Sequence, residues 1–341
     1  MKINNFQINQ NSPVFIIAEL SANHNGSLET ALETVRAAKR AGADCIKLQT
    51  YTADTITLDS NKPDFIINGT IWEGRKLHDL YQEAYTPWDW HQAIFDEAKK
   101  EGLICFSSPF DKSAVDFLED LNTPAYKIAS FEITDIPLIE YVASKGKPII
   151  ISTGIAEKED IELAIETCRK VGNNDIAILK CTSSYPAPIE EANLIMIQDF
   201  SKLFNVIPGL SDHTIGATVP VVATALGAKI IEKHFILDRS IGGPDASFSM
   251  NEMEFTEMVQ AVRNAEKAIG TVNYELTEKQ ASGKAFARSL YVAEDIQIGE
   301  LFTEKNIRSV RPGFGLHPKF LPEILGTKAT KNYSKGDRFS L

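Results

Sequence analysis

The segment VFIIAELSANHNGSLETALETVRAAKRAG, residues 14–42, contains an apolar run, a polar loop and an amphipathic stretch in that order. An apolar run without alternation, such as 14–20, is typical of a parallel strand that is covered on both faces. Residues 27–42 have helical spacing, with Ser27 suited to cap the N-terminus and Gly42 suited to end the helix. The segment therefore predicts one strand–helix unit of an α/β fold.

Further apolar runs repeat this pattern, and each ends in a polar or ionisable residue. They span 45–50, 103–109, 125–130, 148–154, 176–182, 206–213 and 229–235. Eight strand–helix units match the length and rhythm of a (β/α)8 TIM barrel, whose active sites lie at the C-terminal ends of the strands. We therefore expect a TIM barrel over residues 1–270, with its chemistry at the polar strand ends.

Helical spacing recurs between these strands. The predicted helices span 27–42, 88–102, 111–121, 135–146, 157–172, 214–227 and 251–270. A long insertion at 52–87 is polar, aromatic and irregular. Loops of this length in a compact domain are usually functional or mobile. We expect the insertion to form a wall or lid at the catalytic end of the barrel.

The rhythm changes after residue 270. Residues 271–285 are predicted to be a linker, and 286–341 to form a small β-rich domain. Two similar turn sequences, IxxGExF at 296–302 and YSKGDRF at 333–339, support this prediction. A domain of this size has a small core, so we expect it to pack on its own barrel or on a partner chain.

Composition excludes several classes of protein. The net charge is −11, from 35 basic and 46 acidic residues. No segment is dominated by a stripe of Lys and Arg residues of the kind that binds nucleic acid. The four cysteines form no CxxC pair, as is typical of a reducing compartment. The N-terminal segment lacks the apolar stretch of a signal peptide, and no run approaches the ~20 residues of a membrane span. We expect a cytoplasmic enzyme that does not associate with membranes.

Two histidines end neighbouring predicted strands. His213 lies in GLSDHT (209–214) and His234 in IEKHF (231–235). Two neutral imidazoles with open positions suit a divalent metal that acts as a Lewis acid. The alternative is that backbone hydrogen bonds satisfy both side chains. The matching positions favour a metal site.

Three ionisable residues lie within apolar strands. Lys47 and Lys127 are costly to bury unless they meet an anion, so together they predict an anion-binding site. Snorkelling, buried ion pairing and a Schiff-base lysine are the alternatives. Glu19 ends the first strand, where burial raises a carboxyl pKa. It is a candidate acid/base or ligand, or else a salt-bridge partner.

Further polar residues at the strand ends and in the adjoining loops are candidates for substrate binding. They are Gln49, Ser130, Glu132, Ser152, Tyr185, Ser211 and Asp245. Asp245, in a Gly/Pro-rich loop, is suited to bind substrate hydroxyls. The simpler interpretations are that the strand-end residues cap or form turns and that Asp245 is a solvated loop residue. Arg311, in SVRPGFGLHPK (309–319), has a local pattern that indicates little by itself.

Taken together, these motifs resemble the sialic acid synthase family across nearly the whole chain. The matching segments are AELSANHNG, KLQT, YKIAS, STG, KCTSSYP, GLSDHT, IEKHF, GGPD and RPG. The family condenses phosphoenolpyruvate with an open-chain amino sugar to give a nine-carbon 2-keto acid. The resemblance implies a C-terminal antifreeze-like (SAF) domain at 286–341. It further implies Mn²⁺, Mg²⁺ or Co²⁺ at His213 and His234, and a homodimer in which the SAF domain of one chain covers the partner's barrel.

The resemblance also implies roles for single residues. Lys47 and Lys127 would hold phosphoenolpyruvate, Glu19 would position the attacking water, and Arg311 would lie over the sugar bound to the partner chain. Asp245 is followed by ASFS, as in the branch that makes pseudaminic acid from 2,4-diacetamido-2,4,6-trideoxy-L-altrose. A sialic or legionaminic acid synthase, a Schiff-base aldolase and a non-enzymatic carbohydrate- or ice-binding protein are the alternatives.

Overall fold

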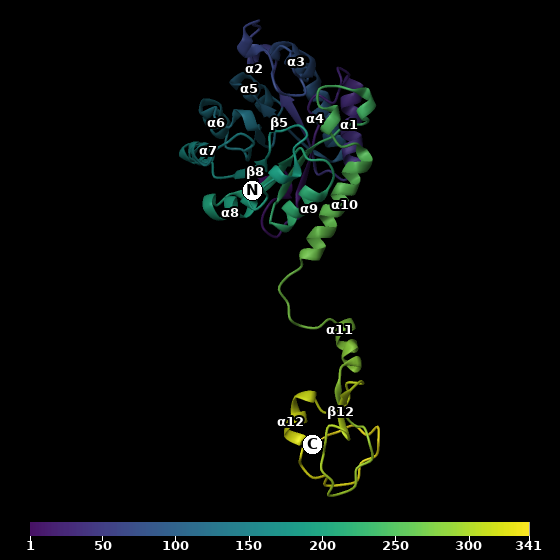
Figure 1. The fold of residues 1–341 in the computed structure, drawn as a ribbon. Coiled ribbons are helices and arrows are strands. Elements are labelled where there is room, and N and C mark those ends of the chain that lie inside the picture. The colour runs from purple at the N-terminus through teal and green to yellow at the C-terminus, as the bar shows by residue number, and fades with distance from the viewer. Residues whose placement is uncertain (341) are drawn as a thin grey trace. The chain divides into compact units, whose positions relative to one another are not determined.

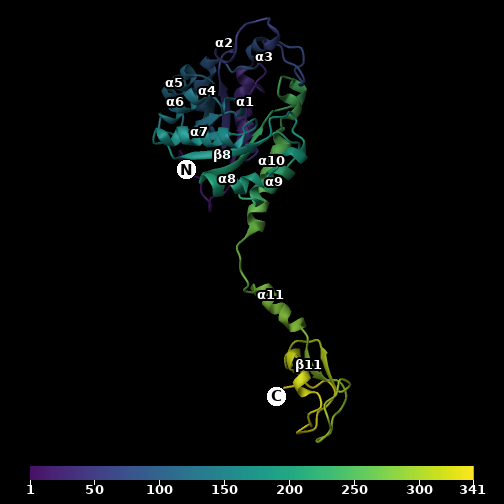
Figure 2. The same cartoon turned by 60° about the vertical axis from the view of Figure 1, so that its left-hand side comes forward.

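A closed barrel of eight parallel strands forms the larger part of the chain (Figures 1 and 2). The structure is a computed structural model that describes residues 1–340. The strand order around the barrel is β10-β3-β4-β5-β6-β7-β8-β9, which confirms the predicted fold class. The strands are β3 (Phe15–Glu19), β4 (Cys45–Thr50), β5 (Ile104–Pro109), β6 (Tyr126–Ile128), β7 (Ile149–Ser152), β8 (Ile176–Cys181), β9 (Ile207–Asp212) and β10 (Ile230–His234).

Helices surround the barrel, as both views show. They are α1 (Leu28–Arg40), α4 (His91–Glu101), α5 (Lys112–Asp120), α6 (Ile136–Ala143), α7 (Lys158–Lys170), α8 (Met196–Phe204), α9 (Thr218–Ala225) and α10 (Glu252–Ile269). Seven of them correspond to predicted helices. The eighth, α8, was not predicted. It is short and begins at Met196, and Ile195 at its N-cap position provides no side-chain cap, so the usual start signal is absent.

Strand register sets the positions of the functional side chains. Glu19 on β3 lies opposite Lys47 on β4 and opposite His234 on β10. Glu232 on β10 lies opposite Ser211 on β9. Since successive side chains of a strand point to opposite faces, Glu232 and His234 point to one face and the residue between them to the other. The strand register of the barrel alone therefore brings these residues together.

Apolar residues fill two separate layers. Outside the barrel, Ile16, Leu48 and Ile231 pack beneath the helices in one cluster. Inside it, a second cluster that includes Phe15 and Phe106 closes the lower end. The N-terminal hairpin of β1 (Lys2–Ile3) and β2 (Phe6–Gln7) adds apolar side chains to this inner cluster. The interior below the functional residues is therefore a packed core, as expected for this fold.

The insertion at 52–87 contains two short α-helices. They are α2 (Ala53–Ile56) and α3 (Leu77–Ala84), which lie at the top of Figures 1 and 2. Thr52 and Thr55 form a reciprocal cap at the start of α2. A hairpin precedes α3, with Ile67 N donating to Arg75 O at 2.8 Å. The rest of the segment consists mostly of turns and loops, so its irregular sequence corresponds to short helices joined by irregular stretches.

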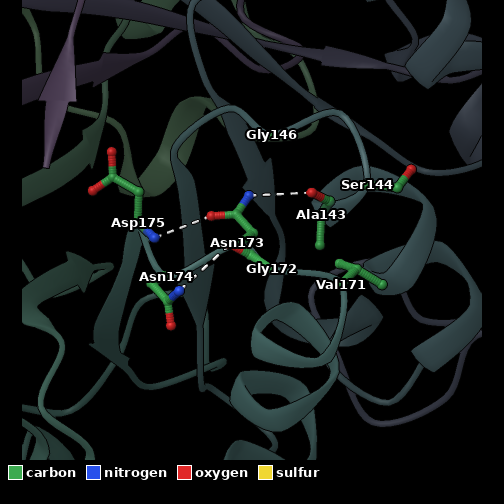
Figure 3. A pocket seen from close by; sticks show the side chains of 8 residues that line it. All are labelled: Ala143, Ser144, Gly146, Val171, Gly172, Asn173, Asn174 and Asp175. Carbon is green, nitrogen blue, oxygen red and sulfur yellow. Dashed lines mark hydrogen bonds between the residues drawn. The ribbon is translucent and has the colours of Figure 1, made fainter.

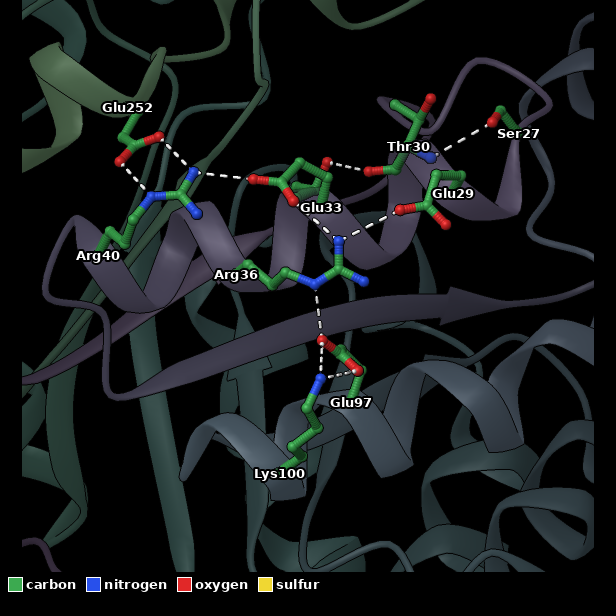
Figure 4. Close-up of polar contacts among 10 residues, drawn as sticks. Ser27, Glu29, Thr30, Glu33, Arg36, Arg40, Glu97, Lys100 and Glu252 are labelled. Atoms are coloured by element: carbon green, nitrogen blue, oxygen red, sulfur yellow. Dashed lines mark hydrogen bonds and ion pairs between the residues drawn. The ribbon is translucent and has the colours of Figure 1, made fainter.

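Ion pairs on the outer surface link α1 to its neighbours (Figure 4). Arg36 pairs with Glu33 on its own helix and with Glu97 on α4, at 2.8 and 2.7 Å. Arg40 pairs with Glu252 on α10 at 2.8 Å. The three helices α1, α4 and α10 thus share one surface network.

The chain divides into two compact units, and the second begins at Thr271. The segment expected to be a linker, 271–285, contains α11 (Glu278–Ser282). Beyond it, β11 (Ser289–Val292) and β12 (Ile307–Val310) form an antiparallel pair, and α12 (Leu321–Ile324) contributes to a small separate core. None of the helices in residues 1–340 combines the length and hydropathy needed to cross a membrane.

Candidate active site

Polar residues at the C-terminal ends of the barrel strands line one cavity of about 410 Å³. Twelve of the candidate residues from the sequence lie in its lining: Glu19, Lys47, Gln49, Lys127, Ser130, Glu132, Ser152, Tyr185, Ser211, His213, His234 and Asp245. Arg311 is an exposed residue of the second unit. Residues that are far apart in the sequence therefore share one site because parallel strands all end at the same face.

Two lysines and two glutamates form what we call the polar floor of the cavity: Glu19, Lys47, Lys127 and Glu232. All four are buried. Lys47 Nζ contacts the Glu19 carboxylate, and both lysine Nζ atoms lie 3.7 Å from Glu232 Oε1. The lysines therefore do not extend to solvent. They pair with carboxylates, and the four charges cancel when all are ionised.

Burial and charge pairing shift the pKa values of the polar floor. Burial raises the pKa of Glu19 to about 7, while Lys47 opposes this rise. Burial lowers the pKa of Lys127. Burial also disfavours the charged form of Lys47, but Glu19 and Glu232 outweigh it and raise the Lys47 pKa. Glu19 is therefore the member of the floor suited to exchange a proton near neutral pH.

A chain of hydrogen bonds runs from the floor to Asp245, which lies near His234. Gln49 Nε2 donates to Glu19 Oε1 at 3.3 Å and to Ser21 Oγ at 2.9 Å. Ser21 Oγ donates to Asp245 Oδ2 at 2.5 Å, and Asp245 Oδ2 lies 3.7 Å from His234 Nδ1. This chain fixes the orientation of Gln49 and Asp245 within the cavity.

His213 and His234 face each other, with ring centroids 5.3 Å apart. His213 Nδ1 donates to Thr182 O at 3.0 Å, which leaves its Nε2 lone pair free. His234 Nδ1 is buried and has no hydrogen-bond partner. Burial and the neighbouring His213 hold the pKa of His234 well below its usual range, so this ring is neutral. Burial disfavours the charged form of His213, but the neighbouring Cys181 outweighs burial and raises the pKa of His213. In their neutral forms the two imidazoles offer free lone pairs that fit a divalent cation.

Other protein ligands are absent from this pair. Within residues 1–340, no group of three or more His, Cys, Asp or Glu side chains is arranged to hold a metal ion. A cation bound by His213 and His234 would thus leave its remaining positions to water or substrate. Such an open site is typical of catalytic rather than structural metals.

Hydroxyl and carboxyl groups complete the cavity. Ser130 Oγ accepts a hydrogen bond from Gly154 N at 3.1 Å, and a side chain at Gly154 would collide with the hydroxyls of Ser130 and Ser183. Ser152 Oγ and Glu132 Oε2 are buried without partners. Burial raises the pKa of Glu132 to about 7. Buried polar atoms without partners are available to hydrogen-bond a ligand.

The opposite side of the cavity is apolar. Eight residues of the insertion line the cavity, and we call the six with large side chains the apolar wall: Ile56, Ile67, Trp72, Leu77, Leu80 and Tyr81. The Tyr185 ring contacts both the wall and the histidines, 4.4 Å from the His213 ring and 5.8 Å from the Trp72 ring. The cavity therefore has two chemically different sides that meet at Tyr185.

The sequence did not single out Glu232, Ser21 or the apolar wall. Glu232 lies two residues before His234 in the same strand, so strand alternation would have placed both on one face. Ser21 precedes a loop and carries no distinctive pattern. The wall depends on how the insertion folds, which no local spacing specifies.

A second hollow of about 460 Å³ lies at the turns that follow α6 and α7 (Figure 3). Its lining residues are Ala143, Ser144, Gly146, Val171, Gly172, Asn173, Asn174 and Asp175. Asn173 donates to Ala143 O at 3.3 Å and accepts from Asp175 N at 3.0 Å. These bonds brace two turns that precede β7 and β8. The hollow is therefore at the end of the barrel away from the cavity.

Comparison with known proteins places this arrangement in a family. Residues 34–274 match the NeuB family, and residues 287–338 match the SAF domain. A pseudaminic acid synthase of Campylobacter jejuni is 53% identical over 99% of this chain and 98% of that protein. Another from Helicobacter pylori is 51% identical over 94% of each. A crystal structure of an N-acetylneuraminic acid (sialic acid) synthetase from Leptospira borgpetersenii, in complex with citrate, has a TM-score of 0.74 at 31% identity and covers 83% of this chain and 94% of that one.

Proposed function

The chain belongs to the NeuB family, and from this membership and its cavity we propose that it is a pseudaminic acid synthase. It would condense phosphoenolpyruvate with 2,4-diacetamido-2,4,6-trideoxy-L-altrose and water, giving pseudaminic acid and phosphate, which makes it a transferase. One observation carries the proposal: two lysines, a carboxylate with a raised pKa and two facing histidines line a single cavity. Identity above 50% to pseudaminic acid synthases supports the choice of sugar.

Phosphoenolpyruvate would bind at the polar floor. Lys47 and Lys127 are buried cations that can exchange a carboxylate partner for the carboxylate and phosphate of this substrate. Ser152 Oγ, which has no partner, and the hydroxyls of Ser130 and Ser211 would complete the binding of its oxygens. These groups would hold C3 of the substrate toward the sugar.

Bond formation would follow from this placement. The C3 carbon attacks the sugar aldehyde carbon, whose oxygen takes up a proton and becomes a hydroxyl group. Water then adds at C2, and one of its protons passes to Glu19, which balances the proton taken up by the aldehyde oxygen. The C2–O bond to phosphate breaks, the C2 hydroxyl becomes the ketone, and its proton leaves with phosphate. A pKa near 7 suits Glu19 for this transfer. Holding both reactants together in the cavity supplies proximity, which can lower a barrier by ~7–11 kcal/mol.

His213 and His234 would hold the divalent cation, with Mn²⁺, Mg²⁺ or Co²⁺ as the candidates. When bound, it would supply Lewis acidity toward the aldehyde oxygen. The free Nε2 of His213 and the partnerless Nδ1 of His234 support this assignment. Asp245, Gln49, Glu132 and Tyr185 would contact the sugar.

A panel of amino sugars tests the function. Phosphate release from phosphoenolpyruvate is measured with 2,4-diacetamido-2,4,6-trideoxy-L-altrose, with the sugar precursor of legionaminic acid and with N-acetylmannosamine. The altrose derivative should be turned over and N-acetylmannosamine should be a poor substrate. Comparable turnover of N-acetylmannosamine or of the legionaminic precursor would assign the chain to another branch of the family.

We further propose that the active form is a homodimer in which Arg311 of one chain reaches the cavity of its partner. A guanidinium offers several directed donors to an acetamido or hydroxyl oxygen. Arg311→Ala and His213→Ala homodimers should both be inactive. Mixed subunits should regain activity, because one site of the heterodimer then combines an intact barrel with an intact Arg311. No activity after verified subunit exchange would reject this arrangement.

A further inference from the structure

The apolar wall comes entirely from one segment of the chain, the insertion at 52–87. Its Leu80 is buried, and the other five side chains are half-buried against the cavity. Other large apolar residues of the same insertion, Leu58 and Ile71, are 66% and 53% exposed and do not line the cavity. The insertion therefore presents a selected set of apolar side chains to the site.

Hydrogen bonds and ion pairs hold the wall in place. Trp72 Nε1 donates to Pro244 O at 3.3 Å. Pro244 directly precedes Asp245 in the loop that follows β10. The hairpin closes through Gly74 N, which donates to Ile67 O at 2.8 Å. Lys76 pairs with Asp59 at 2.7 Å. Contacts within the insertion thus hold the wall together, and Trp72 connects it to the loop that carries Asp245, a proposed sugar contact.

The aromatic contacts of Tyr185 indicate which end of the sugar would meet the wall. The Tyr185 ring contacts both the His213 ring and the Trp72 ring. If the sugar aldehyde lies at the histidines, as the proposed function requires, the chain of the sugar that extends past Tyr185 reaches Trp72. The wall therefore meets the end of the sugar that is remote from the aldehyde.

An apolar wall distinguishes substituents at that end. A hydroxyl placed against Trp72, Leu77 and Ile67 loses its hydrogen bonds to water and gains none from these side chains, because Trp72 Nε1 already donates to Pro244 O. A methyl group in the same place gains contact area. We propose that Trp72 and Leu77, with Ile67, form a subsite for the terminal methyl group of a deoxy sugar and select it over a hydroxymethyl terminus. This inference rests on the proposed function and adds the residues that choose the sugar.

The test compares two sugars that differ by one oxygen atom: 2,4-diacetamido-2,4,6-trideoxy-L-altrose and its 6-hydroxy counterpart. The full chain is assayed with Mn²⁺, and kcat/KM is measured for each sugar. The wild type should prefer the deoxy sugar by about 10²-fold, the scale of discrimination in an apolar pocket. Trp72→Ala and Leu77→Thr should reduce this preference to less than about tenfold, while the KM for phosphoenolpyruvate stays unchanged.

Two variants serve as controls. Ile71→Thr changes an exposed neighbour of Trp72 and should leave the preference intact. Trp72→Phe keeps an apolar ring and should retain most of it. If Trp72→Ala does not fold, as judged by circular dichroism, Leu77→Thr decides the matter alone.

Each result has a separate meaning. An unchanged preference in folded Trp72→Ala and Leu77→Thr, or an equal loss for both sugars, overturns the subsite while the proposed function stands. A wild type that releases phosphate with neither sugar refutes the proposed function, and the subsite with it.

Discussion

The polar floor and the apolar wall enclose the same cavity but are built in different ways. The floor residues lie on β3, β4, β6 and β10, and adjacent strands are held in register by backbone hydrogen bonds. The wall residues lie on an inserted segment attached by contacts such as the one between Trp72 and Pro244. Rigid strands suit groups that must align with reacting atoms, while an insertion can vary without disturbing them. Changes in the floor should therefore affect every sugar, and changes in the wall should affect the choice among sugars.

Removing a histidine beside the floor should have the largest effect. His234→Ala or His213→Ala should lower kcat/KM by more than about 10³-fold for every sugar, because several kcal/mol of Lewis-acid stabilisation are lost. Mn²⁺ binding, measured by isothermal titration calorimetry, should disappear in both variants and persist in Trp72→Ala. Full activity of the wild type after removal of divalent cations would contradict the metal assignment.

Glu19 should have the next largest effect. Glu19→Gln keeps the shape of the side chain and removes its charge, so the rate should fall by ~10²-fold, the scale of general-base catalysis. The loss should be similar for the deoxy sugar and its 6-hydroxy counterpart, unlike the loss in Trp72→Ala. Binding of phosphoenolpyruvate is the control and should survive. An unchanged rate would assign Glu19 a structural role only.

Glu132 should affect stability through its protonation. Burial raises its pKa from 4.5 to about 7, so the folded state binds more protons than the unfolded state between these values. Its contribution to stability is therefore fully present below pH 4.5 and is lost as the pH rises through about 7. Glu132→Gln should remove this loss and be more stable than the wild type at pH 8 by about 1–2 kcal/mol, less than the full shift implies because the side chain is partly exposed.

Urea denaturation at pH 4.5 and pH 8 measures this difference. At pH 4.5 the two proteins should be close in stability, because the wild-type carboxyl is largely neutral in the folded state. Equal stability at both pH values would show that the pKa of Glu132 is not raised by folding.

The floor could be predicted from the sequence to a large extent. Lys47 and Lys127 are conspicuous because a lysine within an apolar strand is costly to bury. His213 and His234 end neighbouring strands, so the barrel topology alone brings them together. Glu232 was missed because the run EKH (232–234) places three ionisable residues in sequence, although strand alternation separates Lys233 from the other two. The structure shows Lys233 paired with Asp212.

The wall could not be predicted to the same extent. Trp72 is placed by contacts with Pro244 and Tyr185, which are more than 100 residues away in the sequence. Its position thus depends on tertiary structure rather than on spacing or propensity. The same holds for α8, whose apolar residues Ile197 and Phe200 are positioned by packing rather than by a cap.

The ion pairs around α1 should have the smallest effect and serve as a reference for both regions. Arg36 pairs with Glu33 and Glu97 on the outer surface (Figure 4), away from the residues that line the cavity. Surface pairs gain little, because water and salt screen them and two long side chains lose conformational freedom. Arg36→Ala should therefore lower the melting temperature by no more than a few degrees, less at high salt, and leave both kcat/KM and the preference between the two sugars unchanged. A change in the sugar preference in this variant would mean that the preference responds to general destabilisation of the barrel, and the distinction between floor and wall would then not hold.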